Sequence, residues 1–298
     1  MSTTTQHPGA HAGAFESSSG GAHLGFGGVI ASEWIKFRTV RSTVWTLSIT
    51  LILMVGLSLL VAFGVTSAMD SSHMTTADAG TDGAGIVTFG YLIAQMIVAV
   101  LGVLSITGEY STGMIRSTLA AVPRRLPALW AKALVLSVAT AVVSIVGVGL
   151  AYLVTQPMLS SHGLAVDLGD RTTQRILLGC VLYLVAIAML GFALGAVLRH
   201  SAAAISTVLG VMLLLPVLVL LIGNWVSWVR DLSPYLPTTA GERIMSTSTA
   251  VQAGASGSGS GSASGPTPLA PWTGLGLLAG YVVAVLTLAA VMLRRRDA

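Results

Sequence analysis

The residues best placed to do chemistry lie in the stretch from Ile106 to Arg125, ITGEYSTGMIRSTLAAVPRR, between two long apolar runs. It carries one glutamate and three arginines: Glu109, Arg116, Arg124 and Arg125. Ser111 or Thr112 can cap a helical turn, apolar residues then recur at helical spacing, and Pro123 marks the end. The pattern predicts a short amphipathic helix at one membrane face, with Glu109 and the basic residues turned to water. Its chemistry would be ionic contact with a soluble partner.

The sequence lacks the residue groupings that catalysis or nucleotide binding requires. A P-loop needs Gly-Lys-Ser/Thr, whereas the only lysines, Lys36 and Lys132, follow isoleucine and alanine. There is no HExxH, no Ser/His pair within the apolar runs and no pair of deep carboxylates. The single cysteine, Cys180, excludes a disulfide framework and a zinc site of several cysteines. We therefore expect a non-catalytic chain without catalytic, cofactor-binding or metal-binding residues.

The composition indicates an integral membrane protein. Apolar residues make up 54% of the 298 positions and charged residues only 9%, against about 25% charged in soluble proteins. Six apolar runs are long enough to cross the hydrocarbon core as helices. We place them at about 44–68, 86–108, 128–155, 175–198, 202–223 and 272–293. The expected fold is all-α, and residues 29–298 form the membrane domain.

The basic residues predict the orientation of these spans. With the N-terminus inside the cell, the inner side holds Lys36, Arg38, Arg41, Arg116, Arg124, Arg125, Lys132, Arg199, Arg294, Arg295 and Arg296, and the outer side holds Arg171, Arg175, Arg230 and Arg243. Eleven against four satisfies the positive-inside rule. Both termini and the 106–125 stretch are then expected to be cytoplasmic.

The segments outside the spans differ in character. Residues 1–28 are rich in Ser, Thr, Gly and Ala, and we expect a disordered tail. The next segment, 29–41, has the pattern of a basic interfacial helix, or simply of a positive flank that orients the first span. The outer loop 224–271 begins with Trp225 and Trp228, which indicate either an aromatic belt or short helices dipping into the membrane. It ends in a flexible Gly/Ser linker at 254–268.

No Asp, Glu, Lys or Arg lies in the middle of a span, which counts against an ion-coupled carrier. Gln95 is expected to form an interhelical hydrogen bond. Two small-residue pairs, Gly191/Gly195 and Gly276/Gly280, permit close helix approach, within the subunit or between subunits. Pro216 is expected to kink the fifth span.

This order of elements resembles an ABC-2 type permease, the membrane subunit of a bacterial ABC exporter, and its details are most similar to actinobacterial members. The resemblance covers roughly residues 30–298 without the linker. The residues that carry it are SEWIKFRTVRSTVW, then GEYSTGMIRSTLAAVPRR after two spans, YLPTTAGERIM outside, and a last span that ends in RRR.

The resemblance implies a six-helix, type V exporter-like subunit that pairs with a second permease subunit and a separate ATPase, which uses ATP and Mg. It identifies 109–123 as the coupling helix, with Glu109, Gly113, Arg116 and Pro123 as the residues that transmit motion. It also implies an interfacial elbow with Glu33, Trp34, Lys36 and Arg38. An extracellular gate near 225–245 would contain Trp225, Trp228, Pro234, Tyr235 and Pro237.

The expected function is therefore the permease subunit of an ATP-driven exporter in the plasma membrane, with a hydrophobic or amphipathic cargo and no nucleic-acid partner. Two alternatives remain open. The chain could be a membrane anchor or signalling subunit that transports nothing and docks a cytoplasmic partner. It could also be a carrier driven by an ion gradient.

Overall fold

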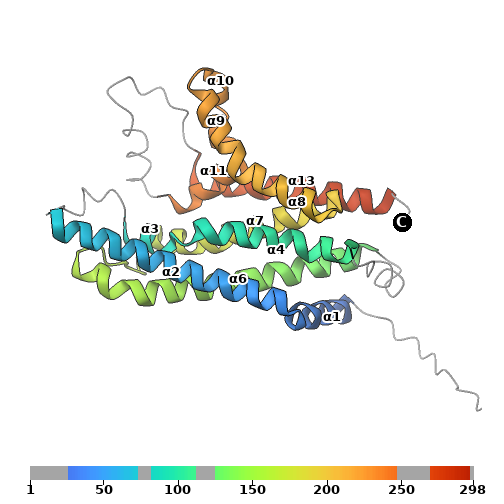
Figure 1. The fold of residues 1–298 in the computed structure, drawn as a ribbon, viewed down its shortest axis with the longest axis horizontal. Coiled ribbons are helices and arrows are strands. Elements are labelled where there is room, and N and C mark those ends of the chain that lie inside the picture. The colour runs from blue at the N-terminus through green and yellow to red at the C-terminus, as the bar shows by residue number, and fades with distance from the viewer. Residues whose placement is uncertain (1–25, 73–81, 112–124, 247–268, 296–298) are drawn as a thin grey trace, which may run out of the picture.

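The computed structural model describes residues 26–72, 82–111, 125–246 and 269–295, and within these ranges every regular element is a helix (Figure 1). The long helices are α1 (Phe26–Thr39), α2 (Arg41–Ser72), α4 (Tyr91–Ser111), α6 (Arg125–Ser161), α7 (Arg171–Leu198) and α13 (Pro271–Arg295). The shorter ones are α3 (Gly83–Thr88), α8 (Ser201–Leu209), η1 (Gly210–Leu214), α9 (Leu215–Gly223), α10 (Ser227–Arg230), η2 (Ser233–Tyr235), α11 (Pro237–Glu242) and η3 (Arg243–Met245). Helix α1 begins inside the segment predicted as a tail.

Six helical stretches of the described chain are long and apolar enough to cross a membrane, which confirms the predicted all-α fold with six spans. They cover Arg41–Ser71, Gly83–Tyr110, Leu126–Ser161, Arg171–Leu198, Ser201–Gly223 and Pro271–Leu293. The shortest has 23 residues, which at about 1.5 Å per residue exceeds a hydrocarbon thickness of about 30 Å. Helix α1 and the last turns of α13 lie at the same end of the bundle (Figure 1). We call it the charged end, and the opposite end, with α3 and α11, the far end.

Helices α4 and α7 pack closely at the centre of the bundle because glycines face backbone atoms across their interface. A Cβ atom on Gly191 would lie 2.2 Å from the Ala99 carbonyl oxygen, and one on Gly102 would lie 2.1 Å from that of Ala188. The Gly191/Gly195 pair therefore serves packing within the subunit. In contrast, no described side chain or neighbouring backbone lies within 4 Å of a Cβ placed on Gly276 or Gly280.

The second span is divided into two helices near its far end. Asp82 caps α3, since its side chain accepts a hydrogen bond from the Gly85 amide at 2.8 Å. Between α3 and α4, the Ser58 hydroxyl of α2 donates to the Val87 carbonyl and accepts from the Gly90 amide. Gly90 is required here, because a Cβ would lie 2.0 Å from the Met54 carbonyl oxygen. The break is thus stabilised by α2.

The fifth span is also irregular and leaves the bundle. It runs as α8, the π-helical turn η1 and α9, with Pro216 in the first turn of α9. A proline lacks the amide proton that would continue the α-helical pattern, which accounts for a wider turn just before it. Figure 1 shows α9 and α10 turning away from the other spans, in agreement with the prediction of a kink at Pro216.

Candidate functional site

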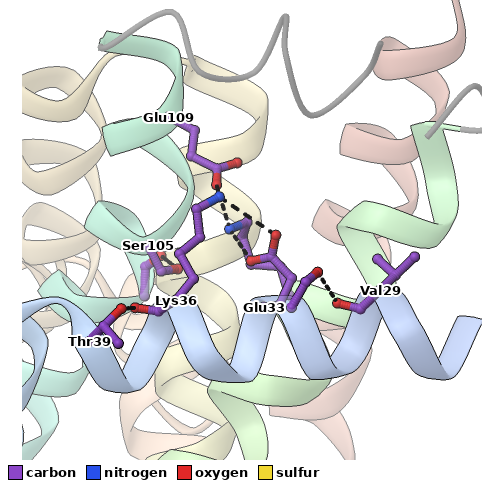
Figure 2. Close-up of polar contacts among 9 residues, drawn as sticks. Val29, Glu33, Lys36, Thr39, Ser105 and Glu109 are labelled. Atoms are coloured by element: carbon purple, nitrogen blue, oxygen red, sulfur yellow. Dashed lines mark hydrogen bonds and ion pairs between the residues drawn. The ribbon is translucent and has the colours of Figure 1, made fainter. Parts of the chain in front are cut away.

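Four charged side chains from three helices meet at the charged end of the bundle, and Figure 2 labels three of them, Glu33, Lys36 and Glu109. Glu33 and Lys36 come from α1, Glu109 from the last turn of α4, and Lys132 from the start of α6. We call this group the charge ring. Glu109 lies two residues before α4 ends and Lys132 shortly after α6 begins, so the ring includes a residue close to each end of the segment 112–124.

Each carboxylate of the charge ring contacts both lysines. Lys132 Nζ lies 2.6 Å from Glu33 Oε2 and 2.9 Å from Glu109 Oε1. Lys36 Nζ donates to Glu109 Oε1 and lies 3.7 Å from Glu33 Oε1. Positive and negative groups therefore alternate around a closed ring whose formal charges cancel.

The local sequence explains how α1 contributes to the ring. Val29, Glu33 and Phe37 recur every four residues and so share one face of the helix. Val29 and Glu33 are the buried residues of α1, while Trp34 and Arg38 are exposed. Helix α1 packs on α6 and α2 through its buried face, which carries Glu33 inward to Lys132. The elbow helix is therefore held to the bundle by a buried charge as well as by apolar contact.

Three of the four side chains are largely removed from solvent. The exposed fraction of the side chain is 8% for Glu33, 11% for Glu109 and for Lys132, and 32% for Lys36. Burial lowers the pKa of the Lys36 ammonium, but the hydrogen bond and charge of Glu109, together with Glu33, outweigh this effect and raise the pKa above 10.5. Buried charges of this kind require mutual compensation, because an uncompensated ion in low dielectric is costly.

The expectation that Glu109 faces water at the start of a separate surface helix is wrong. Glu109 is 9% exposed and belongs to the membrane helix α4, whose helical pattern continues past the apolar run to Ser111. Its charge is compensated by lysines from α1 and α6, and this contact favours burial of the carboxylate. Of the other residues predicted to transmit motion, Gly113, Arg116 and Pro123 lie outside the described residues.

A second contact at the charged end joins the α7–α8 turn to α4. The Arg199 guanidinium lies 5.4 Å from the centroid of the Tyr110 ring, a cation–π geometry. Arg199 ends α7 with a left-handed backbone (φ 55°), and its amide donates to the Gly195 carbonyl at 2.9 Å. His200 then caps α8 through its ring nitrogen. The last turn of α4 is therefore in contact with α1, α6 and the α7–α8 turn.

The residues predicted to form an outer gate separate into two groups. Trp225 and Trp228 are 89% and 67% exposed, as in an aromatic belt. Pro234 is the second residue of η2 and Pro237 the first of α11, and these helices fold back against the bundle. Tyr235 accepts a hydrogen bond at its carbonyl oxygen from the Tyr281 hydroxyl of α13, at 2.9 Å. The loop therefore contains short helices, as one interpretation predicted, whereas the aromatic belt stays a prediction.

Sequence reasoning did not find the charge ring as a unit. It identified Glu33 and Lys36 as elbow residues and Glu109 as a contact for a partner, and it treated Lys132 as a topology signal. The contacts of Arg199 and Tyr110 were also missed. One available signal was the placement of Glu33 on the apolar face of α1. Another was Lys132, a lysine inside an apolar run, because charged residues at such positions are rare without partners.

Comparison with known proteins agrees with the architecture. The family model described as ABC-2 family transporter protein matches residues 29–298, which includes the charge ring and all six spans. A search of curated proteins found no match to the chain. The family match covers the membrane domain from the elbow helix to the C-terminus, and the chain therefore belongs to the ABC-2 family of transporter proteins.

Proposed function

We propose that this chain is the permease subunit of an ATP-driven exporter and that its charge ring transmits the motion of a separate ATPase to the spans. Membership of the ABC-2 family makes the chain a membrane component of an ABC transporter. Export, the cargo and the mode of coupling are the proposed elements. The charge ring is the observation that carries the coupling proposal, because it joins both flanks of the predicted docking segment to the elbow helix.

In this proposal the ATPase docks on the segment between α4 and α6 at the cytoplasmic face. A displacement of that segment would pull on the last turn of α4 and the first turns of α6. The charge ring resists separation of these two ends and passes the displacement to α1, since Glu33 contacts Lys132. An ATPase can change the conformation of the bundle only through contacts that differ between its two states, and Arg116 is proposed as one of them.

The rest of the assembly follows the same proposal. ATP and Mg bind to the partner ATPase, and the permease acts as a dimer with a second permease subunit. The open surface beside Gly276 and Gly280 of α13 is available for such contacts. The complex lies in the plasma membrane with both termini in the cytoplasm, which the excess of basic residues at that face supports. An apolar or amphipathic cargo would suit spans without charges at mid-depth.

The proposal is tested with the full chain co-expressed with its ATPase in inside-out membrane vesicles. The readouts are ATP hydrolysis and ATP-dependent accumulation of amphipathic fluorescent dyes. Gly113→Pro is expected to leave the complex assembled while abolishing dye accumulation. Lys132→Met is expected to lower accumulation more than tenfold per ATP hydrolysed, whereas Lys132→Arg retains the charge and restores much of it. Arg38→Lys, which keeps the charge of an exposed residue on α1, is the control and should match the wild type.

Three outcomes would contradict the proposal. Dye accumulation that follows an ion gradient and continues without ATP would identify a carrier. A stable complex that hydrolyses ATP but moves none of the dyes, in the wild type as in Gly113→Pro, would favour an anchor or signalling subunit. Equal coupling in Lys132→Met and the wild type would remove the charge ring from the mechanism even if export itself is observed.

A further inference from the structure

A second group of polar residues, some buried and some partly buried, lies at the far end, where α11 and η3 fold back between α7 and α13. We call residues 237–246 the re-entrant segment. A Cβ on Gly241 would lie 2.7 Å from the Tyr183 ring and 2.6 Å from a Leu278 methyl group, so the segment fits tightly against both helices. Arg175 of α7 holds its end, donating to the carbonyl oxygens of Ile244 at 2.7 Å and Ser246 at 2.9 Å.

The last residue of α11, Glu242, meets a hydrogen-bonded pair from two spans. The Tyr183 hydroxyl is fully buried and donates to Gln95 Oε1 at 2.5 Å, which bears out the expected interhelical role of Gln95. Glu242 Oε1 lies 3.5 Å from the same hydroxyl oxygen. A tyrosine hydroxyl has one proton, and here Gln95 receives it. The 3.5 Å separation is also longer than the charge-assisted bond of about 2.5–2.7 Å that an ionised carboxylate forms with a hydroxyl.

The surroundings of Glu242 do not supply a compensating ion pair. Within the described part of the chain, no Lys, Arg or His nitrogen forms a salt bridge with its carboxylate. Away from the charged end, the charged and titratable groups on the elements packed around it are Tyr91 of α4, Arg171, Arg175, Cys180 and Tyr183 of α7, Arg243 of η3, Tyr235 of η2 and Tyr281 of α13. An ionised Glu242 would therefore be poorly stabilised, whereas a neutral carboxyl could donate its proton to the Tyr183 oxygen.

Glu242 nevertheless has a route to water. It lines a cavity of about 300 Å³ at the far end, together with Gly85, Thr88, Tyr91, Thr239, Arg243, Met245 and Ser246. Burial raises the pKa of the Glu242 carboxyl to about 7, although the positive charge of Arg243 opposes the rise. A carboxyl with such a pKa changes its protonation state near neutral pH.

From this geometry we infer that Glu242 is a proton-binding site that controls how firmly the re-entrant segment is seated. With the proton bound, the carboxyl donates to Tyr183, Tyr183 donates to Gln95, and α11 is joined to α7 and α4. Without it, the segment carries a negative charge that no described ion pair compensates, and it detaches more readily. The proton enters from the cavity. This inference concerns the seating of the segment and does not depend on whether the chain exports a cargo.

The sign of the pH dependence follows from linkage. The pKa of Glu242 is raised in the seated state, so this state binds more protons than the detached state between the ordinary pKa of 4.5 and about 7. Seating is therefore firmest in acid and weakens as the pH rises through about 7. Above that range both states are ionised and the dependence ends.

Cys180 offers a native probe, because it is the only cysteine of the chain, is fully buried and follows Gly179, against which Ile244 of the segment packs. The rate of thiol labelling is measured for the full chain in lipid nanodiscs and divided, at each pH, by the rate for Glu242→Gln. The ratio removes the pH dependence of thiol chemistry. It is expected to rise on the order of tenfold between about pH 5.5 and about pH 8, with a midpoint near 7.

Two further variants separate the proton site from general effects. Asp231→Asn changes an exposed acid that follows α10 and should keep the wild-type profile. Tyr183→Phe removes the acceptor of Glu242 and should increase labelling already in acid. If Cys180 stays unlabelled at every pH, the rate of amide exchange of residues 237–246 replaces the labelling rate. It is again divided, at each pH, by the rate for Glu242→Gln. The inference would be overturned if the ratio of wild-type to Glu242→Gln rates does not change with pH. It would also be overturned if Asp231→Asn alters the pH profile as Glu242→Gln does.

Discussion

Replacement of Lys132 by methionine tests the charge ring most directly, since methionine keeps a long side chain but removes the ammonium. Lys132, counted over the whole residue, is 9% exposed, and its ammonium lies between the carboxylates of Glu33 and Glu109. In the variant, two buried carboxylates share only Lys36, and the ring changes from neutral to a net charge of −1. Removing one partner of a buried ion pair costs about 3–5 kcal/mol, because the remaining charge is uncompensated. We expect a loss of that size in the free energy of unfolding.

The assay is reversible unfolding in mixed detergent micelles, followed by helical circular dichroism. The matched control is the double variant Glu33→Gln/Lys132→Met, in which the ring is neutral again. If the cost arises from the uncompensated charge, the double variant should be more stable than Lys132→Met alone, and a double-mutant cycle should give a coupling of at least about 1 kcal/mol. A Lys132→Met protein as stable as the wild type, or a double variant that loses the sum of the two single costs, would refute the reasoning.

Three further predictions concern other contacts of the described chain. Gly191→Val should lower the free energy of unfolding by about 3 kcal/mol, the upper part of the range for overpacked cores, because its Cβ would meet the Ala99 carbonyl oxygen. Gly280→Val has open space beside it and should change the free energy of unfolding of the monomer little. Arg175→Gln should lower the free energy of unfolding by about 2 kcal/mol and speed amide exchange in 237–246, because two hydrogen bonds from a charged group are lost. Unchanged amide exchange in these residues would contradict this prediction. Lys36 has a raised pKa, so its stabilising effect is complete below pH 10.5 and is lost as the pH rises above that value. Unfolding of Lys36→Met should lack this alkaline loss, and an identical pH profile in both proteins would contradict the assignment.

The prediction of the fold succeeded where the determining property is local. Each span is specified by its own hydropathy and length, so all six could be located without knowledge of their neighbours. The same holds for the elbow helix, whose pattern indicated a helix beside the first span, and for Pro216, which alters the backbone at its own position. The residues 112–124, 1–25 and 247–268, on which other expectations depend, lie outside the described ranges.

The prediction of the sites failed where a side chain's environment depends on distant segments. Glu109 has the same sequence neighbours whether it faces water or a lysine, and its partner Lys36 is 73 positions away. The two glycine pairs have the same spacing, yet only Gly191 and Gly195 meet another helix. Similarly, nothing near Glu242 in the sequence indicates that Tyr183, 59 positions earlier, lies beside its carboxyl group.

The sequence by itself determined the membrane class, the number of spans and the end at which basic charge collects, because transfer of a helix into hydrocarbon depends on the sum of its own side chains. Only the tertiary structure decided which charges compensate one another, which glycines allow close packing and which carboxyl lies beside a buried tyrosine. These properties arise from the distances between helices, which no single segment specifies.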